Sequence, residues 1–179
     1  SYTGATTIGA GTTIKLGTAV AIPDSSAVTV NGTLDLNSYS ETIGSLAGSG
    51  TVTSSSGTPL FTVGQESAAA TTFSGVLSNI SLTKTGTGVL TLSGANTYTG
   101  FTKVTSGILA LGANEVIPNV SAFYFSGGTL RTEGFTETAG LVHLNADSRV
   151  VFGSGVHRLT FSGPGTFTAG RTLQVNGWE

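Results

Sequence analysis

The 179-residue chain repeats itself at a spacing much longer than a single helix or strand. Residues 2–6 have the sequence Tyr-Thr-Gly-Ala-Thr, and residues 98–102, which begin 96 positions later, have Tyr-Thr-Gly-Phe-Thr. The tripeptide Ile-Pro-Asp at 22–24 returns 95 positions later as Ile-Pro-Asn at 117–119. Such long self-similarity is typical of solenoids, in which stacked units share a continuous core.

Apolar and polar residues alternate within each unit. Val28 and Val30 flank Thr29, and Leu34 and Leu36 repeat the pattern a few residues later. A period of two places the apolar side chains on one face of a strand, and the glycines and Asn-Ser pairs between these runs indicate turns. No stretch has a helical period, so the sequence predicts short strands joined by tight turns.

The composition fits this pattern and excludes several classes of protein. Charged residues make up 9% of the chain, against about 25% in an average soluble domain. Because 38% of the residues are hydrophobic, the 27 glycines do not belong to a disordered linker. The seven basic residues are scattered and the net charge is −2, so no nucleic-acid-binding stripe is present. The sequence has no cysteine for a disulfide and no apolar run long enough to span a membrane.

These observations predict an all-β fold, a parallel β-helix (β-solenoid). A sandwich or a barrel also uses short strands, so strand content alone does not decide between them. The long repeat, the uniform strands and the low charge favour stacked coils in which inward Val, Leu, Ile and Phe form ladders. We predict one segment over residues 1–179, with a repeat of about 96 residues that is complete over 2–97 and incomplete over 98–179.

The central part of the chain also carries a family resemblance. Residues 81–100, from Ser-Leu-Thr-Lys-Thr-Gly-Thr-Gly to Asn-Thr-Tyr-Thr-Gly, continue to Gly-Ile-Leu at 107–109. This run resembles the autotransporter-associated β-strand repeat of bacterial autotransporter passenger domains and related giant surface proteins, and the likeness covers most of residues 1–145. The resemblance implies a right-handed parallel β-helix, located outside the cell or at the bacterial surface, that acts as a stalk or scaffold. Phe101 departs from the family, which usually has a small residue there.

No arrangement of residues predicts a catalytic, cofactor or metal site. Glu133 and Glu137 are the closest pair of carboxylates, but Glu137 is the repeat equivalent of Glu41, which indicates a structural role at a coil corner. A calcium site or a polysaccharide-processing enzyme are the alternatives, because both need convergent carboxylates. His143 and His157 have no Ser in a nucleophile-elbow context. Lys84 and Lys103 flank turns and are expected in solvent.

Aromatic side chains are the candidate ligand contacts. Tyr39, Tyr124 and Phe135 fall at outward or loop positions, as does Tyr98, and exposed aromatic groups often mark interaction surfaces. Stacking between coils is the structural alternative for these rings. Pairs of the form Thr-x-Thr raise an ice-binding alternative, but their spacing along the chain is irregular.

The sequence therefore predicts a non-enzymatic stalk or passenger segment that supports adhesion from the bacterial surface. A glycan- or matrix-binding adhesin module is the alternative, and a polysaccharide-processing β-helix enzyme or an ice-binding protein is less favoured. The expected partners are host or environmental glycans, matrix, or neighbouring copies that associate through the solenoid ends.

Overall fold

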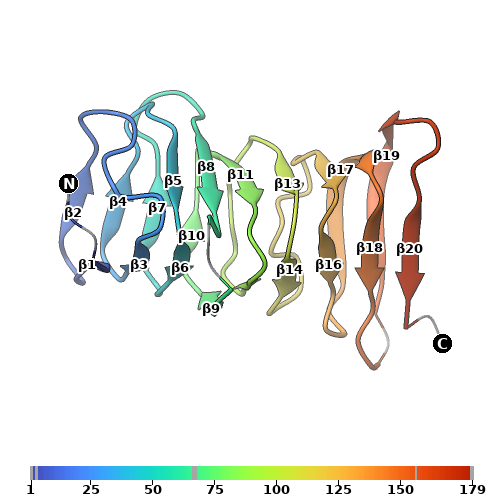
Figure 1. Ribbon diagram of the computed structural model, residues 1–179. Coiled ribbons are helices and arrows are strands. Elements are labelled where there is room, and N and C mark those ends of the chain that lie inside the picture. Colours follow the sequence, from blue (N-terminus) through green and yellow to red (C-terminus); the bar gives the residue numbers. More distant parts are fainter. Residues whose placement is uncertain (1, 3, 66–67, 156, 178–179) are drawn as a thin grey trace.

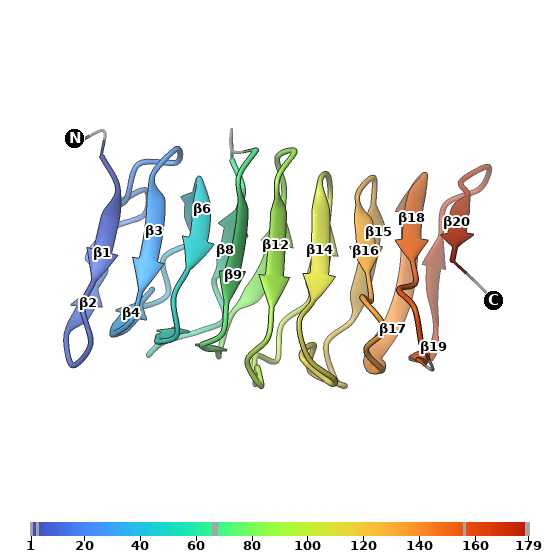
Figure 2. The ribbon, with the colours of Figure 1, turned by 90° about the horizontal axis from the view of Figure 1, so that it is seen from below.

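The computed structural model describes residues 2, 4–65, 68–155 and 157–177, and all of its paired strands run parallel. Figures 1 and 2 show the strands stacked side by side from one terminus to the other, in about eight turns of a β-solenoid. This confirms the predicted all-β parallel solenoid. In chain order the strands are β1 (Thr6–Ile8), β2 (Thr13–Lys15), β3 (Ala27–Val30), β4 (Thr33–Asp35), β5 (Glu41–Ile43), β6 (Ser45–Ala47), β7 (Thr51–Thr53), β8 (Leu60–Val63), β9 (Ala70–Phe73), β10 (Val76–Leu77), β11 (Ser81–Lys84), β12 (Val89–Leu92), β13 (Thr102–Val104), β14 (Ile108–Leu111), β15 (Phe123–Ser126), β16 (Thr129–Arg131), β17 (Glu137–Ala146), β18 (Ser148–Val151), β19 (Leu159–Phe167) and β20 (Leu173–Asn176).

The strands form faces that run along the solenoid. One face begins as the sheet β1-β3-β6 and continues as β9-β12-β14-β16-β18-β20, and a bridge between Gly48 and Phe73 joins the two parts. A second face, β5-β8-β11-β13-β15-β17-β19, has seven strands. The third face, β2-β4-β7-β10, occupies only the N-terminal half. The cross-section therefore changes from three strands per coil to two near residue 80.

Inward ladders of apolar side chains fill the solenoid. Leu90, Leu109 and Leu130 are aligned by the registers of β12, β14 and β16, and each is at most 1% exposed. Burying one such side chain stabilises the fold by roughly 1.5–3 kcal/mol. The alternation in the sequence is confirmed, because Val28 and Leu34 are equally buried while the outward Thr29 is half-buried.

Tyr98 points into the core, so its expected outward position is wrong. Its hydroxyl bonds to the Thr102 hydroxyl at 2.6 Å, and Thr102 bonds in turn to Ser121 at 2.9 Å. All three side chains are fully buried. This corner is not a strand, so the sequence has no alternation there that indicates the direction of the ring. The chain of hydroxyl hydrogen bonds offsets the cost of burying the phenol oxygen.

Candidate functional site

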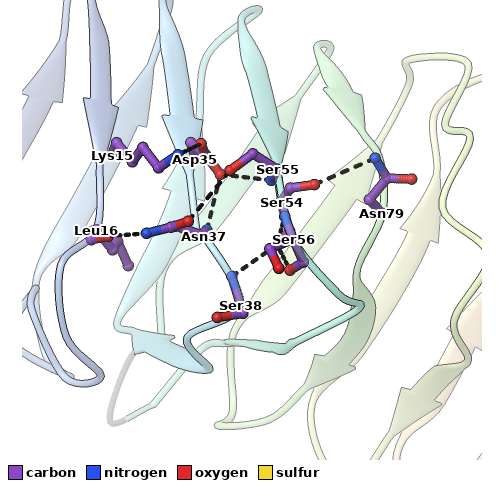
Figure 3. A network of polar contacts seen from close by, with 9 residues as sticks. All are labelled: Lys15, Leu16, Asp35, Asn37, Ser38, Ser54, Ser55, Ser56 and Asn79. Atoms are coloured by element: carbon purple, nitrogen blue, oxygen red, sulfur yellow. Dashed lines mark hydrogen bonds and ion pairs between the residues drawn. The ribbon is translucent and has the colours of Figure 1, made fainter.

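A polar network at one coil corner accounts for several of the charged and amide side chains of the N-terminal half (Figure 3). Asp35 accepts backbone N–H bonds from Asn37 at 2.9 Å and Ser55 at 2.8 Å, and it pairs with Lys15 at 3.7 Å. The Asn37 amide donates to the carbonyl of Leu16 in the preceding coil at 3.0 Å. Desolvation acts to raise the pKa of Asp35, but these donors and Lys15 outweigh it and lower the pKa. The network fastens successive coils together through the Asp35 carboxylate and the Asn37 amide.

Glu41 and Glu137 play the same role at two other corners. Glu137 is fully buried and accepts backbone N–H bonds from Val116 at 2.9 Å and Ile117 at 3.2 Å, both in the preceding coil. Glu41 accepts in the same way from Ala21 at 2.8 Å and Ile22 at 3.4 Å. These carboxylates lie at the coil corners that the sequence indicates, but they are buried rather than solvated.

Burial sets the protonation behaviour of both carboxylates. Desolvation raises the pKa of Glu137 to about 7, against the lowering effect of its backbone donors, and the nearby Glu115 contributes in the same direction. Desolvation also raises the pKa of Glu41. Carboxylates with shifted pKa values are common at active sites, but structural hydrogen-bond networks shift pKa values too.

Glu133 and Glu137, the closest carboxylates in sequence, face different surroundings. Glu133 is exposed and pairs with Arg131, whereas Glu137 faces the backbone of the preceding coil. Among the described residues, no group of three or more His, Asp or Glu is placed to hold a metal ion. The structure thus separates the pair that was closest in sequence.

Lys84 is buried inside the solenoid, so its expected solvated position is wrong. It is 2% exposed, its ammonium donates to the Thr85 carbonyl, and desolvation lowers its pKa to about 8. Gly64 and Gly107 lie against it in neighbouring coils, because a Cβ built on either would come within 2.9 Å of Nζ. Side chains alternate along β11, so Lys84 points inward like Leu82, two residues before it. This alternation decides the direction of the side chain despite the preference of lysine for solvent.

The three aromatic residues predicted as ligand contacts lie in different surroundings. Tyr39 and Phe135 occupy equivalent corners after β4 and β16, and both rings are half-buried against the edge of the core. Tyr124, in the middle of β15, points outward from the seven-stranded face. In the described part of the chain, no ring contact joins Tyr124 to Tyr39 or Phe135.

The register of the seven-stranded face instead places Tyr124 in a row of other outward side chains. Lys103 in β13, Tyr124 in β15 and His143 in β17 are direct neighbours across the strands. The His143 imidazole stacks on Tyr124 with ring centroids 4.1 Å apart and an interplanar angle of 9°. Phe101 approaches Tyr124 edge-on at 5.6 Å and 74°. A hollow of about 260 Å³ opens here, lined by Phe101, Lys103, Tyr124 and Asn145.

Sequence reasoning found Tyr124 but missed the side chains that surround it. His143 lies 19 positions after Tyr124, and Lys103 lies 21 positions before it. The spacing between paired residues varies from 18 to 25 along the solenoid. A constant coil length would have revealed the row, whereas this variation hides it.

The same outward row begins with Thr42, Thr62 and Thr83 in β5, β8 and β11. These threonines give way to Lys103 and then to aromatic rings. An ice-binding surface needs a long, flat threonine array, and this row supplies only its first three positions.

Among the described residues, the structure contains no helix of the length and apolarity needed to cross a membrane.

Comparison with known proteins places the central coils in a family. Residues 82–111, which include β12 to β14 and all but the first residue of β11, match the passenger-associated-transport-repeat. The chain is also 34% identical over 145 residues to the Adhesin BmaC autotransporter of Brucella suis biovar 1 (strain 1330). That alignment covers 76% of this chain and 4% of the relative, so the chain spans a small part of the protein that it matches. No solved structure matches the chain. Both matches indicate an extracellular location at the cell surface. The chain carries an autotransporter passenger repeat at residues 82–111.

Proposed function

We propose that this segment is a non-enzymatic, rigid spacer within an adhesive surface protein. The observation that carries the proposal is the cluster of buried apolar side chains that runs along the solenoid from Ile8 to Phe152. About eight turns at about 4.8 Å per turn give a rod roughly 40 Å long. The match to part of a much longer adhesin supports a role as one section of an extended passenger.

Rigidity comes from polar as well as apolar contacts. Glu137 and Asp35 tie the corners of successive coils through backbone hydrogen bonds, and Asn96 does so from a third position. The Asn96 amide oxygen accepts from Leu77 N at 2.8 Å, and its nitrogen donates to the Val116 carbonyl at 2.7 Å. A side chain that bonds the coil before it and the coil after it resists bending at that junction.

Small-angle X-ray scattering of the purified segment tests the spacer. We expect the scattering of a single stiff rod whose length agrees with roughly eight stacked coils. In cells that display the parent protein, exchanging the segment for an unrelated β-solenoid of equal length should preserve adhesion. A flexible, compact or bent particle in solution would contradict the proposal.

Direct binding is the second candidate function, and the outward cluster around Tyr124 supports it. The relative is named an adhesin, and the cluster presents aromatic rings beside a cation at an extracellular surface. Loss of adhesion in the exchange experiment, with the rod length unchanged, would favour this function over a passive spacer.

A further inference from the structure

We propose that the hollow over β13, β15 and β17 binds one carboxylate-bearing sugar of an extracellular glycan. The inference rests on the second candidate function, direct binding, and specifies its site and ligand class. Four side chains line the hollow: Phe101, Lys103, Tyr124 and Asn145. They supply apolar rings, a cation and an amide, a combination that suits the apolar face, acid group and hydroxyls of an acidic pyranose.

The aromatic part of the site is held in place before any ligand arrives. Tyr124 has one ring face covered by His143, and its position is bounded by the edge-on contact with Phe101. His143 is fixed in turn, because its Nδ1 accepts the Thr166 N–H at 2.9 Å. Gly165 makes room for the imidazole, since a Cβ there would lie 2.4 Å from its Cε1 atom. A preorganised platform loses less entropy on binding than a mobile one.

Lys103 gives the hollow its preference for an acid. It is half-buried beside the rings, and none of the ion pairs in the described part of the chain involves it. Asn145 is exposed, lines the same hollow and offers both a donor and an acceptor to sugar hydroxyls. An unpaired ammonium next to a ring surface is complementary to a carboxylate carried on an otherwise apolar sugar face.

A second hollow on the solenoid shows the contrast. It measures about 220 Å³ and contains Asp147 and Arg149, but these groups are already engaged by other residues. Arg149 donates to Gln174 at 3.2 Å, and Asp147 accepts the Thr172 N–H at 2.8 Å. Of these two hollows, the one at Tyr124 has a cation that takes part in none of the ion pairs of the described residues.

Titration of the ¹⁵N-labelled segment with single sugars tests the site. The probes are glucuronic acid, galacturonic acid and N-acetylneuraminic acid, with glucose and galactose as neutral counterparts. We expect saturable shifts of the amide signals at residues 101–103, 124 and 143–145 with at least one acid. We expect its neutral counterpart to bind at least tenfold more weakly.

Two variants and a matched control complete the test. Lys103→Gln and Phe101→Ala should each weaken binding of the acid at least fivefold, while Lys15→Gln, which removes a cation in β2, should leave it unchanged. Circular dichroism verifies that each variant remains folded. Equal affinity for acidic and neutral sugars, an unchanged affinity in Lys103→Gln, or an absence of shifts with all five sugars would overturn the proposal. If the segment still bound a matrix protein after such a result, direct binding would survive and only this site would fail.

Discussion

At the scale of single residues, buried charge is the feature that solvent conditions control most directly. Glu137 is completely enclosed, and its carboxylate accepts from the backbone of the preceding coil. Lys84 is a buried group of the opposite charge, and its ammonium donates to a backbone carbonyl. The parity of β11 placed Lys84 inward, yet residue type alone suggested solvent, so the two signals in the sequence disagreed and parity was correct.

The pKa of Glu137 predicts a loss of stability as pH rises. Its folded pKa is raised from 4.5 to about 7, so its contribution is fully present below about pH 4.5 and is lost as pH rises through 7. We expect the free energy of unfolding to fall by up to about 3 kcal/mol between pH 5 and 8, since one pKa unit corresponds to about 1.4 kcal/mol. Thermal melts followed by circular dichroism across this range measure it.

Glu137→Gln should remove most of this pH dependence, and Glu41, whose pKa is raised in the same direction, supplies the remainder. Glu133→Gln is the control, because that carboxylate is exposed and pairs with Arg131. A pH profile that is unchanged in Glu137→Gln would show that another group controls the stability.

Lys84→Met should stabilise the solenoid more at low pH than at high pH. Burial lowers the pKa of Lys84 from 10.5 to about 8, so the cost of burying this group is fully present below about pH 8 and declines as pH rises from 8 to 10.5. We expect the advantage of the variant to shrink as pH rises from 6 to 9. Chemical denaturation at both pH values gives the two differences, and an equal difference at both would contradict the expectation.

At the scale of strands, the alternation of side chains predicted which strand residues point into the core. Leu34 and Phe125 are inward as the pattern indicates, and Tyr124 is outward between two buried neighbours. The partners of an outward residue were not predictable, because they depend on register and the spacing between coils varies from 18 to 25 residues. The candidate site is therefore visible in the sequence as one residue, Tyr124, and only in the structure as a cluster.

Leu34→Asp should unfold several coils together. Leu34 lies in a ladder with Ile14 and Val52, and it is fully buried. Removing the buried side chain alone costs about 2–5 kcal/mol, and an enclosed carboxylate adds to that loss. Thr33→Asp, at the half-buried neighbouring position, is the control. Hydrogen exchange should show loss of protection across β2, β4 and β7, and a loss limited to β4 would count against cooperative stacking.

Gly165→Ala should displace the His143 ring without unfolding β19. The new Cβ would meet Cε1, Nε2 and Nδ1 of the imidazole within 2.6 Å, so the ring cannot keep its place over the strand. Gly163→Ala is a matched control two residues away, where the nearest atom is 3.5 Å distant. We expect large changes in the aromatic NMR signals of His143 and Tyr124 in the first variant only.

At the scale of the whole molecule, contacts between equivalent residues recur at the spacing of the sequence repeat. Tyr2 bonds to Thr6, and Thr6 bonds to Ser26, as Tyr98, Thr102 and Ser121 do in the second half. The extent of each unit, 2–97 and 98–179, stays a prediction. It can be tested by removing a complete unit.

Deletion of residues 22–116 should leave a shorter but intact solenoid. The deletion joins Ala21 to Ile117. Ile117 is the repeat equivalent of Ile22, 95 positions later, so it takes the place of Ile22 after Ala21. Glu137 then accepts from these two residues, as Glu41 does from Ala21 and Ile22 in the full chain. We expect a cooperative β-sheet melt and a reduced length by X-ray scattering. Deletion of 22–106, which joins coils out of register, is the control and should abolish the melt.

The paired clamps at Glu41 and Glu137 bear on how a protein of this kind can change over generations. Recombination between the two stretches of coding sequence adds or removes one repeat unit, because equivalent residues lie 95–96 positions apart. The junction inherits a carboxylate and its backbone donors from one parent unit or the other. A lineage can thus lengthen or shorten the reach of its surface protein in one genetic event that keeps this carboxylate clamp at the junction.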